Sequence, residues 1–319
     1  MYRADLDAVL LSQVPYPNNE RADDERRAFP LSLVQGEGGF GGIFEFSSGS
    51  DNRFCYIASD GASDGNACTP GLQGSSTLTW DGSRYRATTT RSIPDDVLTI
   101  HTFAVDGAPE GTKDITDTPE NPIAAFVEAA GSSVLIVYQA YPPLWLDVFN
   151  SEMERQLAGP AALLPPTHKP NTPTHTASSN THAAVLLQGK CAAAPIPSNE
   201  PMTFLTVVEQ EGTQRLPVTP VPLSPAVASL LWDGQRYVLL HGGEPLEVSW
   251  FDADGTWLTN RVRLPLDYDN PGHELLSSRV DMAAVAPNDY VVVYDMSQPW
   301  GLETYIARFS LVPSEAEAP

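Results

Sequence analysis

Two hexapeptides concentrate the chemistry-bearing side chains of this sequence. Both fit the pattern W-D-G-x-R-Y, and they run from Trp80 to Tyr85 and from Trp232 to Tyr237. Each combines an aromatic platform with a carboxylate and a guanidinium, a set that could hold a polar ligand or take part in proton transfer. Recurrence favours a structural role instead, because side chains repeated in each unit of a repeat protein maintain that unit. The residues to which we assign this role are Trp80, Asp81, Gly82, Arg84, Tyr85, Trp232, Asp233, Gly234, Arg236 and Tyr237.

Within each hexapeptide the Asp-Gly pair predicts a tight turn. The carboxylates of Asp81 and Asp233 are expected to accept hydrogen bonds from backbone N–H groups of the turn. Gly82 and Gly234 are expected to adopt a positive φ, which glycine does without steric cost. The aromatic residues of the motif are expected to pack between neighbouring structural units.

A second set of chemistry-bearing residues is a histidine series. His168, His175 and His182 lie seven residues apart, and each follows a threonine. Three imidazoles that converge can bind zinc. Seven-residue spacing would place them on one face of a helix, but Pro170 and Pro173 prevent a continuous helix. We therefore predict an exposed loop or outer-strand insertion here, with no metal ion and no cofactor.

Two acidic stretches have the composition of calcium-binding loops. One contains Asp252 and Asp254, and the other contains Asp267, Asp269 and Glu274. Calcium prefers roughly six to eight oxygen ligands, commonly supplied by a D-x-D-x-D-G loop. Neither stretch completes that pattern, and a proline occupies the third ligand position of the second. Turn formation is the favoured interpretation of both.

Linear motifs of known enzyme classes are absent from the sequence. It contains no G-x-S-x-G elbow, no H-E-x-x-H zinc motif, no Walker loop and no Rossmann glycine cluster after a strand. The sequence therefore assigns no catalytic or ligand-binding residue. Tyr141, Trp145 and Trp300 could stack on sugar rings, although the apolar stretch around Trp145 predicts a core position.

The elements that must position these residues are clearest around the second hexapeptide. Residues 227–232 form an apolar stretch, Asp233-Gly234 supplies a turn, and another apolar stretch follows, which predicts a β-hairpin. Residues 246–252 and 256–266 alternate in polarity and predict two further strands. Four strands within about 40 residues are typical of one propeller blade. The continuous apolar inner strand fits a position covered by neighbouring blades on both faces.

Weaker copies of the hexapeptide divide the chain into repeats. An interval of about 50 residues between copies fits one four-stranded blade each. An earlier candidate, Arg53-Phe54, lies too close to the first hexapeptide to complete a regular unit. The residues assigned to the tyrosine position are Tyr85, Val134, Cys191, Tyr237 and Tyr290.

W-D-G-x-R-Y hairpins at this spacing resemble the β-propeller-like repeats common in secreted and surface proteins of bacteria. The resemblance covers most of residues 72–310. It rests on the two hexapeptides that match all five fixed positions of the pattern. It implies a propeller fold and favours an extracytoplasmic or cell-surface location, but no particular activity, because those proteins are functionally diverse. Residues 1–14 lack the apolar centre of a signal peptide, so we expect none in this chain, and a fragment of a longer surface protein stays an open alternative.

We predict an all-β fold, a single closed β-propeller over residues 1–319. Six blades of four antiparallel strands are expected, with five or seven left open. Residues 1–71 are assigned to an irregular N-terminal closing segment and a partial blade, and residues 72–319 to about five blades. The N-terminal strand is expected to complete the last blade by pairing with the C-terminal segment, which removes exposed sheet edges.

The composition limits the classes of partner that the protein can be expected to bind. The chain has 319 residues, with 40 Asp and Glu against 18 Lys and Arg and a formal net charge of −22. Nucleic acids and anionic lipid surfaces are bound through Lys and Arg, so neither is an expected partner. No apolar run reaches the roughly 18 residues of a membrane span, so membrane insertion is not expected. Cys55 and Cys68 could form a disulfide or stay reduced, which the odd cysteine count leaves open.

These observations favour non-catalytic binding or scaffolding. A monomeric acidic disc would present its loops, the grooves between blades and the central depression to a protein or carbohydrate partner. The alternative is a propeller hydrolase or lyase that acts on glycans or another polar substrate at the mouth of the channel. Two or three carboxylates or histidines that converge there would favour the enzyme, whereas a channel lined by apolar or small residues would exclude it.

Overall fold

The computed structural model consists of strands and turns. Among the described residues there is no helix, and so none long and apolar enough to cross a membrane. The structure describes residues 2–11, 28–46, 51–58, 68–72, 77–91, 97–118, 122–140, 144–163, 173–189, 202–221, 227–242, 245–264, 274–298 and 301–313.

The strands form six four-stranded antiparallel sheets, the blades A to F. Blade A consists of β2 (Ala28–Gly36), β3 (Gly39–Phe46), β4 (Asp51–Ala58) and β5 (Cys68–Thr69). Blade B consists of β6 (Leu78–Trp80), β7 (Tyr85–Arg91), β8 (Val97–Phe103) and β9 (Pro109–Ile115). Blade C consists of β10 (Pro122–Ala130), β11 (Ser133–Ala140), β12 (Leu144–Asn150) and β13 (Ala161–Ala162).

The second half of the ring repeats this order. Blade D consists of β14 (Pro173–Ser178), β15 (His182–Gly189), β16 (Met202–Glu209) and β17 (Gln214–Val221). Blade E consists of β18 (Val227–Trp232), β19 (Tyr237–Gly242), β20 (Leu246–Phe251) and β21 (Trp257–Arg263). Blade F consists of β22 (Glu274–Ala286), β23 (Asp289–Gln298), β24 (Gly301–Pro313) and, from the other end of the chain, β1 (Tyr2–Leu11).

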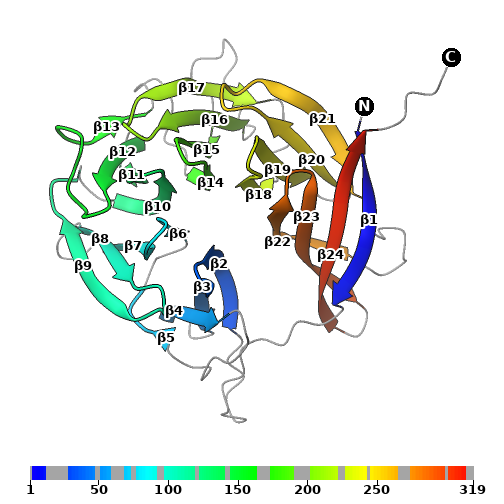
Figure 1. The fold of residues 1–319 in the computed structure, drawn as a ribbon, viewed down its shortest axis with the longest axis horizontal. Coiled ribbons are helices and arrows are strands. Elements are labelled where there is room, and N and C mark those ends of the chain that lie inside the picture. The colour runs from blue at the N-terminus through cyan, green and yellow to red at the C-terminus, as the bar shows by residue number, and fades with distance from the viewer. Residues whose placement is uncertain are drawn as a thin grey trace.

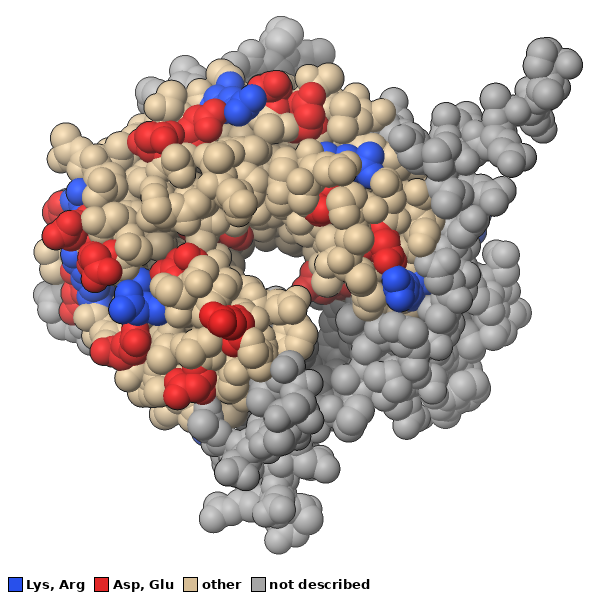
Figure 2. All heavy atoms as spheres, viewed as in Figure 1, with Lys and Arg blue, Asp and Glu red and all other residues tan. Residues whose placement is uncertain are grey.

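The blades surround a central channel. Figure 1 shows the ring. The innermost strands of the six blades are β2, β6, β10, β14, β18 and β22. The space-filling view in Figure 2 shows that the channel is open and that acidic atoms lie on its wall. The predicted six-bladed propeller is confirmed, and five or seven blades are excluded.

The N-terminus completes the last blade, as predicted. β1 pairs antiparallel with β24, and Tyr2 lies opposite Pro313. In Figure 1 the two strands lie side by side at the outside of blade F. This pairing gives β24 a partner on each side and joins the two ends of the chain into one closed ring.

The apolar core is distributed over the interfaces between neighbouring blades. One buried cluster joins blades E and F through residues such as Trp250 and Phe309. Another joins blades C and D through residues such as Leu146 and Phe204. Each fully buried side chain of this size contributes about 1.5–3 kcal/mol, so packing between blades is the main force that holds the ring together.

The inner hairpins define the repeat, and one assignment made from the sequence is wrong. Trp80 pairs with Tyr85 in blade B, and Trp232 with Tyr237 in blade E. In blade D the turn lies between β14 and β15, at residues 179–181, whereas Cys191 follows the end of β15 and lies outside the described residues. The tyrosine position of blade D is therefore Ala183, which pairs with Ser178.

The blade D hairpin escapes a motif search because different residues make the same turn. Ser179 Oγ accepts the backbone N–H of Thr181 at 3.2 Å and of His182 at 3.1 Å, the contacts that an aspartate makes in the two hexapeptides. In blade A the corresponding hairpin pairs Gln35 with Phe40. The candidate Arg53-Phe54 lies instead on β4, the third strand of that blade.

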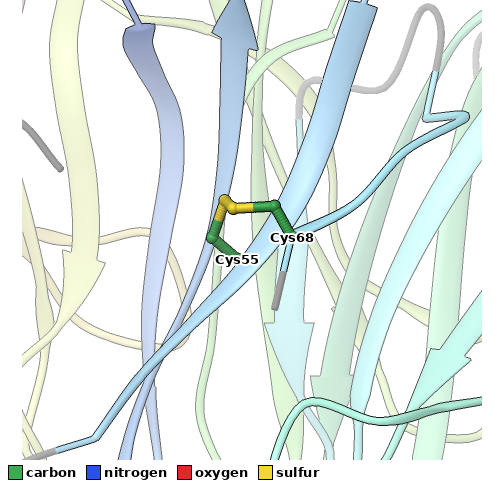
Figure 3. The surroundings of a disulfide bond; sticks show 2 residues. All are labelled: Cys55 and Cys68. Atoms are coloured by element: carbon green, nitrogen blue, oxygen red, sulfur yellow. A yellow bond between two sulfur atoms is a disulfide. The ribbon is translucent and has the colours of Figure 1, made fainter. Parts of the chain in front are cut away.

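A disulfide connects the two outer strands of blade A. Figure 3 shows Cys55 on β4 bonded to Cys68 on β5, two residues that also face each other in the strand pairing. β5 has only two residues, so few ladder hydrogen bonds hold it. Of the two options that the sequence leaves open, the structure has the disulfide.

Candidate functional site

In blade B, the aspartate of the first hexapeptide is the centre of a hydrogen-bond network. Asp81 Oδ1 accepts the backbone N–H of Ser83 at 3.0 Å and of Arg84 at 2.8 Å. Its Oδ2 accepts Arg86 Nε at 2.9 Å, and Arg86 is 2% exposed. Burial alone would raise the pKa of Asp81, but the hydrogen bonds from Arg86 and Ser83 outweigh burial and lower that pKa. Asp81 is therefore held as a carboxylate inside the turn.

In blade E, the second hexapeptide repeats the turn and adds a link to the next blade. Asp233 Oδ1 accepts the backbone N–H of Gln235 and of Arg236, both at 3.0 Å. Its Oδ2 accepts Arg236 Nε at 3.3 Å and the hydroxyl of Tyr290, from blade F, at 2.7 Å. The Arg236 guanidinium also lies over the ring of Trp250, 4.6 Å from its centroid. Asp233 thus joins two blades.

The arginines of the two hexapeptides have different partners. Arg236 bonds to the aspartate of its own turn, whereas Arg84 pairs with Glu110 at 2.7 Å and approaches Glu152 of blade C to 4.0 Å. In blade B the aspartate is bonded instead by Arg86, which lies outside the motif. In both turns a guanidinium therefore bonds to the aspartate. The arginine that supplies it lies inside the motif in blade E and outside it in blade B.

The glycines and tyrosines of the motif follow the geometry of the hairpins. Gly82 and Gly234 have φ of +92° and +97°, values that L side chains rarely adopt. The buried ring of Tyr85 lies against Gly41 of blade A, where a Cβ atom would come within 2.7 Å of it. Burial raises the pKa of Tyr85 to about 12. The ring of Trp80 packs on Tyr85 at a centroid distance of 4.7 Å.

The histidine series is divided by the structure. His168 lies outside the described residues, His175 lies on β14, and His182 begins β15. His182 is buried, with Nδ1 2.8 Å from the hydroxyls of both Ser179 and Thr181, and burial lowers its pKa. Across the described ranges, no three His, Cys, Asp or Glu side chains are grouped so that they could hold a metal ion.

The first acidic stretch forms a turn. Asp252 Oδ1 accepts the backbone N–H of Asp254 and of Thr256, both at 2.9 Å. Asp254 in turn accepts Arg215 Nε at 2.6 Å, so its carboxylate pairs with a cation of blade D. The other three candidate ligands lie outside the described residues. They are Asp267, Asp269 and the side chain of Glu274.

One of the three candidate aromatic residues belongs to a blade interface. Trp145, on β12, is half-buried and packs against the buried cluster that joins blades B and C. Tyr141 and Trp300 lie outside the described residues.

Hydroxyl groups on the inner strands connect neighbouring blades beside the channel. Between blades A and B, Ser32 Oγ accepts the backbone N–H of Leu78 at 3.3 Å. Between blades B and C, Thr79 Oγ1 accepts the backbone N–H of Ala129 at 3.1 Å. These partners lie 46 and 50 residues apart, about one repeat. Each contact therefore joins the inner strands of two successive blades.

At the C–D interface a carboxylate takes the place of the accepting hydroxyl. Glu128, half-buried on β10 of blade C, accepts the Thr176 hydroxyl at 2.6 Å and the Ser178 hydroxyl at 2.8 Å. Both hydroxyls come from β14 of blade D. Burial raises the pKa of Glu128 to about 7, against the opposing effect of the two hydroxyls.

A second inner-strand carboxylate lies on blade F. Asp281 accepts the Ser229 hydroxyl, from β18 of blade E, at 2.6 Å and the backbone N–H of Met282 at 2.7 Å. Its side chain is exposed and lies on β22, the innermost strand of blade F. The partial loss of water raises the pKa of Asp281, and both hydrogen bonds oppose that effect.

The two channel carboxylates occupy different parts of the ring. Blades C and F are separated by two blades in either direction, and each carboxylate has its own hydroxyl partners. Sequence reasoning missed both residues. The signal available for each was a single acidic residue inside an otherwise apolar inner strand, FVEAA around Glu128 and VDMAA around Asp281. A charge at such a position needs a hydrogen-bond partner when the strand is covered on both faces.

Comparison with known proteins supports the fold. No protein-family model matches the chain, and no curated protein matches it by sequence. Among solved structures it is similar to the β-propeller domain of the Trilobed protease from Pyrococcus furiosus, described as having an open velcro topology. The two chains are 12% identical with a TM-score of 0.51, over 88% of this chain and 82% of the other.

The chain is also similar to two further solved structures. One belongs to a study of two prolyl endopeptidases, with 14% identity and a TM-score of 0.50; the match covers 88% of this chain but 39% of that one. The other is a subtype N11 neuraminidase-like protein of A/flat-faced bat/Peru/033/2010, with 12% identity and a TM-score of 0.50, over 98% and 97% of the two chains. At these identities the similarity supports a β-propeller fold and carries no function with it.

Proposed function

We propose that the protein is a non-catalytic binding or scaffolding propeller whose partner is a protein or a carbohydrate. The hydrogen bonds of its buried and inner-strand carboxylates support this proposal most directly. Asp81, Asp233, Glu128 and Asp281 each bond to a turn, a guanidinium or a hydroxyl that holds the ring together. The structural role of the W-D-G-x-R-Y residues is part of this proposal. A rigid ring loses little conformational entropy when a partner binds.

Charge supports the choice of partner. A chain with a net charge of −22 repels phosphate backbones and anionic lipid, and it attracts basic segments. Asp281 accepts a hydroxyl of its own chain, so a carboxylate here has the geometry to accept a sugar hydroxyl or a lysine ammonium. We therefore place the contact with the partner at the central channel of a monomeric ring.

A secreted or cell-surface location belongs to the same proposal. The Cys55–Cys68 disulfide supports it, because disulfides form and persist in oxidising compartments. A bacterial origin, which the hexapeptide resemblance favours, is likewise proposed. The compartment is tested by the redox state of the two cysteines in protein isolated from its source under alkylating conditions.

Binding is tested by calorimetric titration with two defined probes, a lysine tetrapeptide and chitotetraose. We expect one of them to bind, and Asp281→Asn to weaken that binding about tenfold through loss of a charged hydrogen bond. Glu211→Gln is the matched control, because it removes one negative charge from an exposed turn of blade D. Binding of neither probe, or equal weakening by both variants, contradicts the proposal.

A second candidate function is a propeller hydrolase or lyase that acts on glycans or another polar substrate at the channel mouth. Glu128 is the observation that favours it, because a half-buried carboxyl with a pKa raised by burial to about 7 suits a general acid at neutral pH. The test is release of p-nitrophenol from a panel of p-nitrophenyl glycosides. Turnover that Glu128→Gln lowers about 100-fold would establish the enzyme. No turnover, or equal turnover in both proteins, excludes it.

A further inference from the structure

The interface between blades C and D contains one ionisable carboxyl bridge. Glu128 reaches from β10 to β14 and accepts hydroxyls with both of its oxygens, from Thr176 and from Ser178. Thr176 and Ser178 lie 48 and 50 residues after Glu128, so the contact joins the inner strands of two successive blades. At the B–C interface the same position has a neutral contact, in which Thr79 Oγ1 accepts the backbone N–H of Ala129.

The surroundings of Glu128 solvate a charge poorly. The crevice beside it leaves no room for a water molecule and is otherwise lined by Thr176 and apolar side chains of β10, β11, β12, β15 and β16: Phe126, Leu135, Val137, Leu146, Ala183, Val185 and Val208. None of these lining residues carries a charge. Among the described residues, the phenol of Tyr237 on β19 of blade E is a titratable group on which the charge of Glu128 acts. When ionised, Glu128 therefore depends on two hydroxyls and whatever water reaches it from the channel side.

We propose that the C–D interface is a pH-responsive joint, in which protonation of Glu128 strengthens the contact between β10 and β14 and ionisation weakens it. This goes beyond binding as a function, because it concerns how firmly the ring is closed at one place. A protonated carboxyl still bonds to both hydroxyls, accepting from one and donating to the other, and no longer places a charge in an apolar crevice.

The direction of the effect follows from proton binding. The pKa of Glu128 is raised by burial from 4.5 to about 7 in the folded chain, so the folded state binds the proton more tightly than the unfolded state. The resulting stabilisation is fully present below about pH 4.5 and is lost as pH rises through about 7. The folding equilibrium constant changes by at most about 300-fold over this window, because each pH interval of one contributes up to tenfold.

The first experiment is urea unfolding of the full chain and of Glu128→Gln between pH 5 and pH 8.5. Gln keeps the shape and cannot ionise, so the midpoint urea concentration of the variant is expected to rise relative to the parent as pH increases. Glu211→Gln is expected to give the same pH profile as the parent. A difference between Glu128→Gln and the parent that does not vary with pH overturns the proposal.

A second variant covers the case in which Glu128→Gln does not fold. Ser178→Ala removes one donor to the ionised carboxylate, which raises the pKa of Glu128 further, so the pH at which the joint weakens is expected to move upward. The readout is hydrogen exchange of the β10 and β14 backbone amides, which should accelerate above pH 7 by more than the general base-catalysed rate seen in β18. Equal acceleration in β10, β14 and β18 in both proteins contradicts the proposal.

Discussion

The B–C and C–D interfaces solve the same packing problem with opposite electrostatics. At the B–C interface Arg86 is buried and bonds to Asp81 at 2.9 Å, to Thr102 at 2.5 Å and to the backbone oxygen of Ser151 at 2.8 Å. The C–D interface has an apolar cluster and the carboxylate of Glu128, with hydroxyls as its partners. At the B–C interface the charges of Arg86 and Asp81 are paired within blade B, and Arg86 reaches blade C through the Ser151 oxygen. At the C–D interface hydroxyls bond to the carboxylate of Glu128, and no cation among the described residues does.

The difference shows what a partner cation does to a buried acid. The pKa of Asp81 is lowered because the bonds from Arg86 and Ser83 outweigh burial, whereas the pKa of Glu128 is raised because two hydroxyls do not. Pairing has a limit, since burial keeps the pKa of fully buried Asp147 raised although Arg155 bonds to it at 2.7 Å. Stability from Asp81 is lost as pH falls below about 4, and stability from Glu128 is lost as pH rises towards 7.

The largest expected effect breaks the B–C interface. Arg86→Ala removes three hydrogen bonds and leaves Asp81 as an uncompensated buried charge, so the free energy of unfolding should fall by about 3–5 kcal/mol. Arg84→Ala is the matched control, because it removes a cation from a partly exposed pair and should cost less than about 1 kcal/mol. Chemical denaturation measures both, and equal losses would show that the buried network does not hold the interface.

A covalent link gives a reference for these non-covalent contacts. Replacing both Cys55 and Cys68 with serine should lower the free energy of unfolding by about 3 kcal/mol, because the bond restrains a loop with a sequence separation of 13 residues in the unfolded chain. Thermal unfolding with and without reductant measures this. Reductant should destabilise the parent and leave the double variant unchanged; a parent insensitive to reductant argues against the bond.

A buried histidine opposes Glu128 over the same pH range. His241 is 1% exposed, its Nε2 lies 2.8 Å from Ser249 Oγ, and burial lowers its pKa from 6.5 to about 4. Its contribution to stability is therefore present above about pH 6.5 and lost as pH falls towards 4, the reverse of the Glu128 contribution. We expect the two slopes to offset one another in the parent chain.

Single variants should separate the two slopes. In Glu128→Gln the free energy of unfolding should fall by about 2–3 kcal/mol from pH 7 to pH 4.5, since Glu128 no longer opposes the His241 slope. In His241→Gln it should rise over the same interval. Urea unfolding at five pH values measures both, and parallel profiles for the two variants would disprove the opposition.

The smallest expected effect concerns a neutral contact. Thr79→Val keeps the shape of the side chain but leaves the Ala129 N–H without its acceptor, at a cost of about 1–2 kcal/mol that should not vary between pH 5 and pH 8. Thr112→Val, at an exposed position of β9, is the control and should change stability by less than about 0.5 kcal/mol. A pH-dependent effect of Thr79→Val would remove the contrast with Glu128.

The sequence predicts the strands and hairpins of this molecule better than it predicts the polar contacts between the blades. The second hexapeptide predicts the blade E hairpin because Asp233, Gly234 and the flanking apolar runs act locally. The blade D hairpin is missed because Ser179 makes the aspartate's contacts with a different residue type. Glu128 is missed because its partners lie about one repeat away, and only the closed ring brings them to it.

The Cys55–Cys68 bond illustrates the same limit. A separation of 13 residues allows the two cysteines to meet but does not require it. They face each other because β4 and β5 pair at that register, which depends on the outer edge of blade A being in place. Local spacing left two options, and the sheet pairing decides between them.

The most direct test of this account is a carbon NMR titration of the side-chain carboxyls of Asp81 and Glu128 in one sample of the full chain. Asp81 should titrate below the usual range of an aspartate, and Glu128 should titrate near pH 7. Titration of Glu128 between about pH 4 and pH 5, as for an exposed glutamate, would contradict the claim that the C–D interface holds an unpaired, poorly solvated charge.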